Sequence, residues 1–377
     1  MLVIKKFLIL QSNNFLLKQE IVDMVFSQQK KRIAKVRFTF FLYEIALVFI
    51  FLFILLIIPI FLIPLIAEEG TTLYGVLFYL IRAIIIFFGI PLILYLTNLI
   101  FESQKKIILD EDISPSTGHL KMYKMTRKNY KYQIIYGFLI FFWVFLPLDF
   151  LTYFFIPETL TYQAIVFIFK TTNFYLLEDS YLIFLIAAII IQFSVALTEE
   201  TVTRGFFAKR GNEYFFTMSA VMISSLYFGL GHLAYLFEFT AWYPFLWFVE
   251  AFFIGIILAL FVLRKKWILP VIIAHALNNI ISANTIWSIV HGITFQTVTM
   301  FVYFPLFLIG SILAIICLAF VWDFSSFKKG FSNGFSTFKT YFRKDIEEDT
   351  TGDIIFRVFI DILVGTLIFL LGLLIAI

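Results

Sequence analysis

Long apolar runs separated by short polar segments dominate the chain. A membrane-spanning helix needs about 20 consecutive apolar residues. The runs that approach or exceed this length are 38–63, 73–101, 132–156, 181–208, 215–237, 244–263, 267–285, 298–321 and 354–377. The pattern therefore predicts an all-α fold, a polytopic transmembrane helical bundle of about nine spans. The run 160–174 is apolar but short, so we expect it to be interfacial or re-entrant.

The positive charges follow the alternation that nine spans would impose. With the N-terminus inside, the inner segments hold 25 of the 29 Lys and Arg residues, and the outer segments hold Lys170 alone. Those inner segments are 1–37, 102–131, 209–214, 264–266 and 322–353. Because cytoplasmic loops carry the excess of Lys and Arg, we expect a multi-pass protein of the cell membrane with a cytoplasmic N-terminus. The net charge of +4 then reflects topology, and we expect no nucleic-acid partner.

Composition excludes the soluble classes. Of the 377 residues, 62% are hydrophobic and 14% are charged, whereas a soluble chain has about 25% charged residues. The lipid bilayer is therefore an expected partner. The single cysteine, Cys317, excludes a disulfide framework and a thiolate metal cage.

Two polar segments lie outside the predicted spans. Segment 1–37 has the pattern of a basic amphipathic arm. Segment 322–353 has that of a cytoplasmic linker before the last helix, 354–377.

Ionisable residues inside spans are costly and usually mark function or pairing. In this chain they are Glu44, Arg82, Asp149, Glu199, Glu200, Arg204, His232, Glu250, His275, Arg357 and Asp361. We expect structural roles for six of them: mutual pairing of Arg357 with Asp361, surface or bundle contacts for Glu44 and Asp149, and pairing in the bundle for Arg82 and Glu250. The alternative for Glu250 is a third carboxylate at a functional site.

One apolar run ends in a cluster of charge, Leu197-Thr-Glu-Glu-Thr-Val-Thr-Arg-Gly205. Glu200 and Arg204 are spaced i,i+4 and share a helix face, whereas Glu199 points about 100° away. The spacing predicts that Arg204 neutralises Glu200 and leaves Glu199 available for chemistry. The alternative is a purely structural cluster of all three.

Two of the four histidines lie in spans, in Phe228-Gly-Leu-Gly-His232 and His275-Ala-Leu-Asn-Asn279. His275 and Asn279 are i,i+4 and project to one side of a helix. A lone intramembrane histidine is usually a packing residue, but two of them beside a glutamate pair favour a site. A glutamate, two imidazoles and a carboxamide can activate water and stabilise an oxyanion. No nucleophile-elbow pattern supports a serine mechanism.

These three elements resemble the motifs of the CAAX-protease and bacteriocin-processing (CPBP) family, intramembrane proteases similar to the Ras-converting CAAX prenyl endopeptidase. That family carries E-E-x-x-x-R, F-x-x-x-H and H-x-x-x-N motifs on successive helices, and here they read Glu199 to Arg204, Phe228 to His232 and His275 to Asn279. The ordered match extends over about 90 residues, 195–285. The resemblance implies a helical catalytic core, here within 181–321, and the apolar runs place N-terminal transmembrane helices before it, in 38–156.

The resemblance implies an endopeptidase that acts on a peptide or lipidated protein substrate. Glu199 would be the general base, His232 would help to hold the attacking water, and His275 with Asn279 would stabilise the oxyanion. Glu200, Arg204 and Phe228 would support the site. If zinc is bound, its ligands would be Glu199, His232 and His275, which fit a catalytic zinc shell in type and number. Because the H-E-x-x-H spacing is absent, we favour a mechanism without a tightly bound metal.

Two other functions remain open from the sequence. The chain could be a catalytically silent membrane scaffold or immunity protein of the same fold, or an ion-coupled transporter, although we see no inverted repeat.

The depth of each side chain in the membrane provides a test of whether the residues form one site. At 1.5 Å per residue, Glu199 and His275 lie about 13 and 12 Å from the inner ends of their predicted helices, and His232 roughly 25 Å from its own. We predict that the side chains converge nonetheless.

Overall fold

The computed structural model describes residues 37–109, 121–237, 241–321, 324–342 and 351–373. Within these ranges it contains helices and no strand. In these described ranges, nine helical segments are long and apolar enough to cross a membrane: Arg37–Leu65, Thr72–Ile100, Tyr130–Phe155, Tyr181–Tyr214, Thr217–Leu236, Tyr243–Lys265, Leu269–Val290, Phe295–Ala319 and Thr351–Gly372. The prediction of an all-α, nine-span bundle is confirmed.

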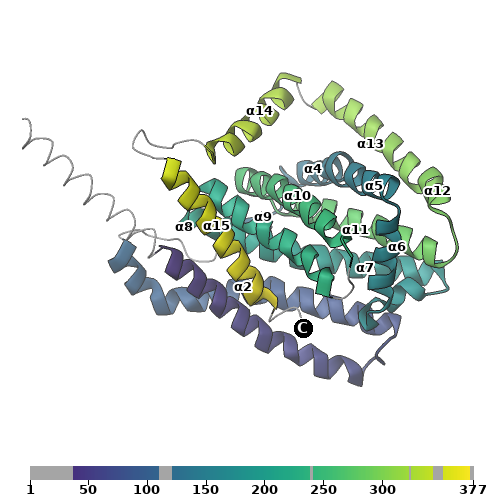
Figure 1. Cartoon of the computed structure of the whole chain (residues 1–377), viewed down its shortest axis with the longest axis horizontal. Coiled ribbons are helices and arrows are strands. Elements are labelled where there is room, and N and C mark those ends of the chain that lie inside the picture. Colours follow the sequence, from purple (N-terminus) through teal and green to yellow (C-terminus); the bar gives the residue numbers. More distant parts are fainter. Residues whose placement is uncertain (1–36, 110–120, 238–240, 322–323, 343–350, 374–377) are drawn as a thin grey trace, which may run out of the picture.

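The helices keep the labels of Figure 1. After the first span they are α2 (Thr72–Leu109), α4 (Tyr130–Ile140), η2 (Phe141–Phe145), α5 (Leu146–Phe155), α6 (Glu158–Ile168), η3 (Thr171–Leu177), α7 (Tyr181–Glu200), η4 (Thr201–Ala208), α8 (Lys209–Tyr214), α9 (Thr217–Leu233) and η5 (Ala234–Phe237). They continue with α10 (Tyr243–Lys265), α11 (Leu269–Val290), α12 (Phe295–Val298), η6 (Thr299–Tyr303), α13 (Phe304–Ile316), η7 (Cys317–Val321), α14 (Phe324–Thr340) and α15 (Thr351–Gly372).

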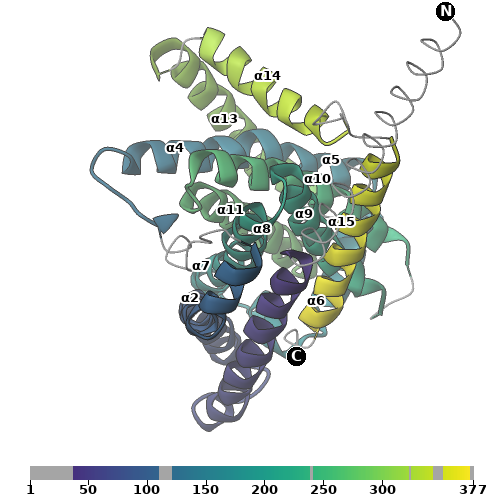
Figure 2. The same cartoon turned by 90° about the vertical axis from the view of Figure 1, so that its left-hand side faces the viewer.

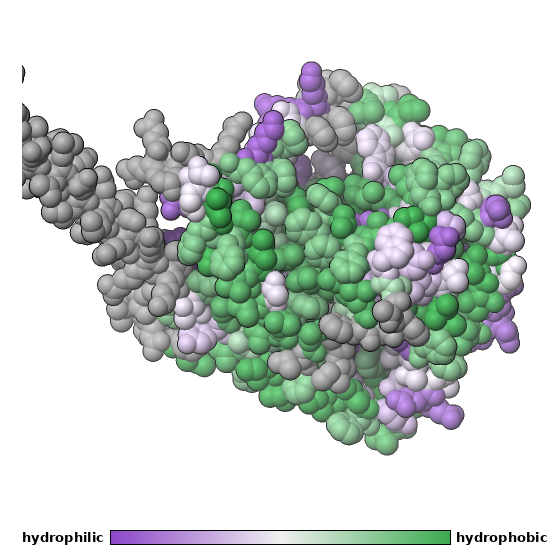
Figure 3. All heavy atoms as spheres, viewed as in Figure 1, coloured by the Kyte–Doolittle hydropathy of each residue, from purple (hydrophilic) through white to green (hydrophobic). Residues whose placement is uncertain are grey.

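Helices α7, α9, α10 and α11 form the centre of the bundle (Figure 1). The first span and α2 cover one side, α4, α5 and α13 cover the other, and α15 packs along α9 (Figures 1 and 2). Apolar residues cover most of the visible outer face, as expected for a surface against lipid (Figure 3).

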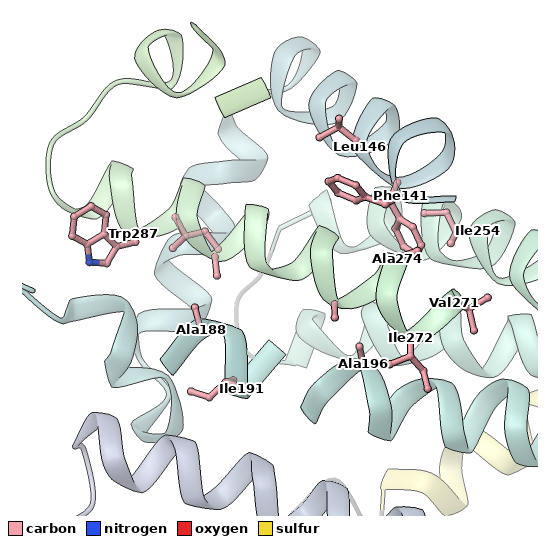
Figure 4. Close-up of a cluster of buried hydrophobic side chains, with 14 of the residues drawn as sticks. Phe141, Leu146, Ala188, Ile191, Ala196, Ile254, Val271, Ile272, Ala274 and Trp287 are labelled. Carbon is pink, nitrogen blue, oxygen red and sulfur yellow. The ribbon is translucent and has the colours of Figure 1, made fainter. Parts of the chain in front are cut away.

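Small residues on α7 allow α11 to pack closely. Ala188 and Ala196 on α7 are fully buried, and Ala196 lies beside Ile272 of α11 (Figure 4). Close packing of small residues is a main source of helix association in membranes. The helix that carries the glutamate pair is thereby held against the helix that carries His275.

The fourth helix is longer than predicted. The sequence predicts a span over 181–208 and a cytoplasmic segment at 209–214, but the helix continues without a break to Tyr214. Its polar end is satisfied by ion pairs: Lys209 Nζ lies 2.5 Å from Glu213 Oε1, and Arg210 binds Glu44 through both Nε and Nη2. Glu44 lies 166 residues away along the chain, so no local pattern indicates this partner.

Directly after Glu200 this helix takes a π-helical form, η4, in which all eight residues are buried. π-helical turns insert an extra residue and are frequent at functional sites. Here the change falls between Glu200 and Arg204, within the charged motif.

The expected structural charges have partners in the bundle. The Tyr341 hydroxyl donates to Asp361 Oδ2 at 2.8 Å, and the Tyr341 carbonyl accepts from Arg357. Both residues thus contact Tyr341, and their direct pairing stays a prediction. Burial beside Asp361 raises the pKa of Tyr341. Asp149 accepts hydrogen bonds from Ser282 at 3.2 Å and from Tyr303 at 3.0 Å.

Part of the predicted cytoplasmic linker 322–353 forms the helix α14, and the linker role itself stays a prediction. Aromatic residues recur there every three or four positions, at 324, 327, 331, 335 and 338, which is the spacing of an amphipathic helix; the Gly, Ser and Lys residues between them hid this pattern. The run 160–174 falls within α6 and η3, and its interfacial place stays a prediction. The predicted arm 1–37 lies outside the described residues up to residue 36.

Candidate active site

Glu199 and Glu200 end α7 and point into different surroundings. The Glu200 side chain is fully buried, whereas 39% of the Glu199 side chain is exposed. Glu200 Oε1 accepts a hydrogen bond from Arg204 Nη1 at 2.8 Å. The structure thus has the Glu200–Arg204 pair that the i,i+4 spacing predicts, with the neighbouring carboxylate free to face a cavity.

His275 on α11 lies between the two glutamates. Its Nδ1 is 2.8 Å from Glu200 Oε1, and its Nε2 is 3.5 Å from Glu199 Oε2. The ring stacks on Phe145 of η2, with 5.7 Å between the ring centroids. Because an ionised carboxylate only accepts, Nδ1 carries the hydrogen in the contact with Glu200. Glu200 therefore fixes the orientation of the imidazole and directs Nε2 towards Glu199.

Phe228 on α9 joins the three motifs. The Arg204 guanidinium carbon lies 4.3 Å from the centre of the Phe228 ring. The same ring meets His232 edge-on at 4.9 Å and His275 edge-on at 5.8 Å between centroids. A cation over a desolvated ring is stabilised by roughly 2 kcal/mol. Phe228 therefore packs under the arginine and holds both imidazoles in place.

His232 stands at the end of α9 and is half-buried. Its Nδ1 lies 2.9 Å from the Phe228 carbonyl oxygen, which can only accept. The hydrogen is therefore on Nδ1, and a neutral His232 presents the lone pair of Nε2 to its surroundings. A Cβ at the preceding Gly231 would meet nothing within 4 Å, so the space beside His232 is open.

That space is a cavity of about 270 Å³ bounded by α2, the α7–η4 helix, α9, η5 and α15. Glu199 and His232 both line this cavity. His275 does not line it but contacts Glu199, which does. The full lining is Arg82, Ile86, Thr198, Glu199, Val202, Thr203, Tyr227, Phe228, Gly231, His232, Ala234, Tyr235, Phe369, Gly372 and Leu373. Asn279 lies one turn beyond His275, is half-buried, and does not belong to this lining.

The longer fourth helix removes the depth conflict between Glu199 and His232. Glu199 lies 15 residues before the helix end at Tyr214, and His232 lies 15 residues after the start of α9 at Thr217. Both distances correspond to about 22 Å at the α-helical rise. The predicted depth of 13 Å for Glu199 was wrong because the charged segment after Ala208 stays helical.

The structure does not assemble the zinc ligand set that the sequence offers as an alternative. Within the described ranges, no group of three or more His, Cys, Asp and Glu side chains is arranged to hold a metal ion. Glu199, His232 and His275 therefore do not fit a shared three-ligand shell in this arrangement.

Several residues around the site were not singled out from the sequence. Thr203 donates to the Glu199 carbonyl at 2.5 Å and accepts from Arg204 Nη1 at 2.9 Å. Tyr123, from the segment before α4, contacts the Thr201 hydroxyl, and burial raises the pKa of Tyr123. Their side chains are common in helices and loops, so only the tertiary structure identifies them.

The central third of the chain matches a known family. Residues 181–281 match the family model described as type II CAAX prenyl endopeptidase Rce1-like. All residues of the three motifs, from Glu199 to Asn279, lie within that match. Comparisons with curated proteins and with solved structures gave no match.

Proposed function

The chain belongs, through residues 181–281, to the type II CAAX prenyl endopeptidase Rce1-like family, and from this we propose that it is an intramembrane endopeptidase that hydrolyses a peptide bond with a water activated by Glu199. The family indicates a protease of the CAAX type with a protein substrate, and the nine apolar helices make it a multi-pass membrane protein. The observation that supports the mechanism best is the division of the glutamate pair into one buried, ion-paired carboxylate and one exposed in a cavity.

In the proposed reaction Glu199 takes a proton from water as the water oxygen attacks the peptide carbonyl carbon. His232 supports this step because the lone pair of its Nε2 can accept the second hydrogen of the same water and hold it in place. Both residues line one cavity, as a water held between them requires. A positioned base of this kind contributes about 10²- to 10⁴-fold.

His275 and Asn279 are proposed to stabilise the oxyanion. The Asn279 carboxamide can donate in any protonation state, whereas His275 can donate from Nε2 only as an imidazolium, since its Nδ1 hydrogen is directed to Glu200. Glu200 and Arg204 act as positioning residues: Glu200 orients His275, and Arg204 compensates the buried charge.

The proposed substrate is a peptide or lipidated protein that enters from the bilayer. Apolar side chains of α2 and α15, namely Ile86, Phe369 and Leu373, form part of the cavity wall, which suits a substrate with a lipid chain. We also propose the cell membrane as the location, with a cytoplasmic N-terminus, because 25 of 29 Lys and Arg residues then lie inside. We favour a metal-free reaction because the candidate ligands do not form a metal shell.

The test is a proteolysis assay with the full chain in liposomes and an internally quenched peptide that carries a prenylated cysteine near its C-terminus. We expect Glu199→Gln to lower kcat/KM by about 100-fold or more, while Glu158→Gln, which changes an exposed carboxylate in the first turn of α6, leaves it unchanged. A chelator should have no effect. If the wild type does not cleave, the chain is better explained as a silent scaffold or a transporter. If Glu199→Gln cleaves as well as the wild type, the role proposed for Glu199 is wrong.

A further inference from the structure

Helix α14 connects two membrane spans without being a candidate span itself. It begins at Phe324, three residues after η7 ends at Val321, a stretch of chain that covers about 10 Å at most. Figure 2 shows α14 running from α13 towards the start of α15, and both of these helices belong to spans. A helix joined this closely to a span must lie near the level at which that span leaves the membrane.

One side of α14 is aromatic, and only part of it packs on the bundle. Phe338 packs against an apolar cluster that contains Tyr341 and Met218. Phe335, one turn earlier, is 54% exposed, and Phe342, directly after the helix, is 56% exposed. Amphipathic helices at a membrane surface bury such rings at the boundary between the headgroups and the acyl chains. The exposed rings of α14 are therefore placed where that boundary lies.

The polar part of α14 is basic. The helix contains Lys328, Lys329 and Lys339, which are all exposed, and no Asp or Glu. Lys328 and Lys339 are eleven residues apart, which is about three turns, so they lie on the same side of the helix. Lys339 Nζ lies 4.6 Å from the centre of the Phe335 ring. This side therefore presents positive charge next to exposed aromatic surface.

A second basic segment lies beside α14. Arg264, Lys265 and Lys266 follow one another where α10 ends, and all three are exposed. Arg264 Nη1 donates to the Gly330 carbonyl of α14 at 3.4 Å. The positive charge of the two segments complements the phosphate groups of anionic phospholipids. Each Lys or Arg near an anionic membrane surface strengthens binding about fivefold.

We propose that α14 binds the surface of the membrane that contains the protein and selects anionic phospholipids there. Phe335 and Phe342 insert at the boundary between headgroups and acyl chains, and Lys328 and Lys339 bind the lipid phosphate groups. The basic segment at the end of α10 extends this surface. The surface lies outside the cavity, and the inference does not depend on the proposed endopeptidase function.

The experiment is hydrogen–deuterium exchange of the full chain in two kinds of nanodisc, phosphatidylcholine alone and three parts phosphatidylcholine to one part phosphatidylglycerol. We expect the α14 amides to exchange about tenfold or more slowly in the anionic discs, and higher salt to reduce this difference. The double variant Lys328→Gln/Lys339→Gln should lose most of it. The matched control Lys124→Gln/Lys128→Gln removes two exposed lysines before α4 and should keep it.

Two results would overturn the inference. The first is equal exchange of α14 in neutral and anionic discs, which the wild type alone decides even if a variant does not fold. The second is a control variant that loses the difference as fully as Lys328→Gln/Lys339→Gln, because net charge and not the surface of α14 would then explain it. Exchange in α9, measured in the same samples, reports whether each variant is folded.

Discussion

Two buried arginine–glutamate networks lie on the same long helix, six residues apart, and differ in how completely their atoms are paired. At Arg210, Glu44 accepts from Nε and Nη2, Glu213 accepts from Nη1, and Tyr214 donates to Glu44. At Arg204, Nη1 is hydrogen-bonded, but Nε and Nη2, and Oε2 of Glu200, are buried with no hydrogen-bond partner among the described residues. Buried polar atoms are nearly always satisfied.

This difference indicates different roles. A network whose arginine and glutamate atoms are all paired specifies packing, and the one at Arg210 ties the end of the fourth helix to the first span. The network at Arg204 leaves buried polar atoms without hydrogen-bond partners in the described part of the chain, next to an exposed carboxylate and two imidazoles. Functional sites are where proteins retain such unfavourable local features. The comparison predicts that changes at the first network cost stability and changes at the second cost turnover.

The largest expected effect is on stability, at Glu44. Glu44→Gln removes the charge that compensates the buried Arg210, and breaking one partner of such a pair costs about 3–5 kcal/mol. The thermal unfolding midpoint in detergent should fall clearly, while the activity per folded molecule changes less than twofold. A variant that is as stable as the wild type, or that loses turnover without unfolding, would remove the contrast between the two networks.

Glu200→Gln should show the reverse pattern. The amide keeps the shape of the side chain but weakens the hold on His275 Nδ1, and replacing the carboxylate that orients a histidine by an amide can cost up to about 10⁴-fold in turnover. We expect a loss of roughly 100-fold in kcat, because Glu199 remains in place. The measurement is kcat of the Glu200→Gln protein that remains folded. If the variant loses stability but keeps its kcat, the network at Arg204 has a structural role, like the one at Arg210.

The sequence was informative wherever one helix decides the outcome. Apolar length located all nine spans, and i,i+4 spacing anticipated that Glu200 and Arg204 pair. Sequence-based prediction failed where contacts between distant segments determine the structure. The helix continues through Lys209–Tyr214 because Glu44 of the first span pairs with Arg210. This added length places Glu199 at the same depth as His232. The place of Arg82 in the cavity likewise depends on how α2 packs against α7, which no spacing within either helix encodes.

The smallest expected effect on stability and turnover concerns the ring of Phe228, which contacts the network at Arg204. Phe228→Leu keeps an apolar side chain on α9 but removes the face under Arg204 and the edges against both histidines. We expect a stability loss of about 1–2 kcal/mol, from the cation–π and ring contacts, and a fall in turnover of about 10-fold (~1.4 kcal/mol), since His232 and His275 gain freedom.

The matched control for Phe228→Leu is Phe49→Leu in the first span. Phe49 is also buried and meets Phe207 edge-on at 5.7 Å between centroids, in an apolar cluster. Because this ring supports no charged group of the site, the variant should lose comparable stability and keep its turnover. Measuring unfolding midpoint and kcat for both variants side by side decides the matter: equal kcat values would mean that Phe228 packs the bundle without positioning the histidines.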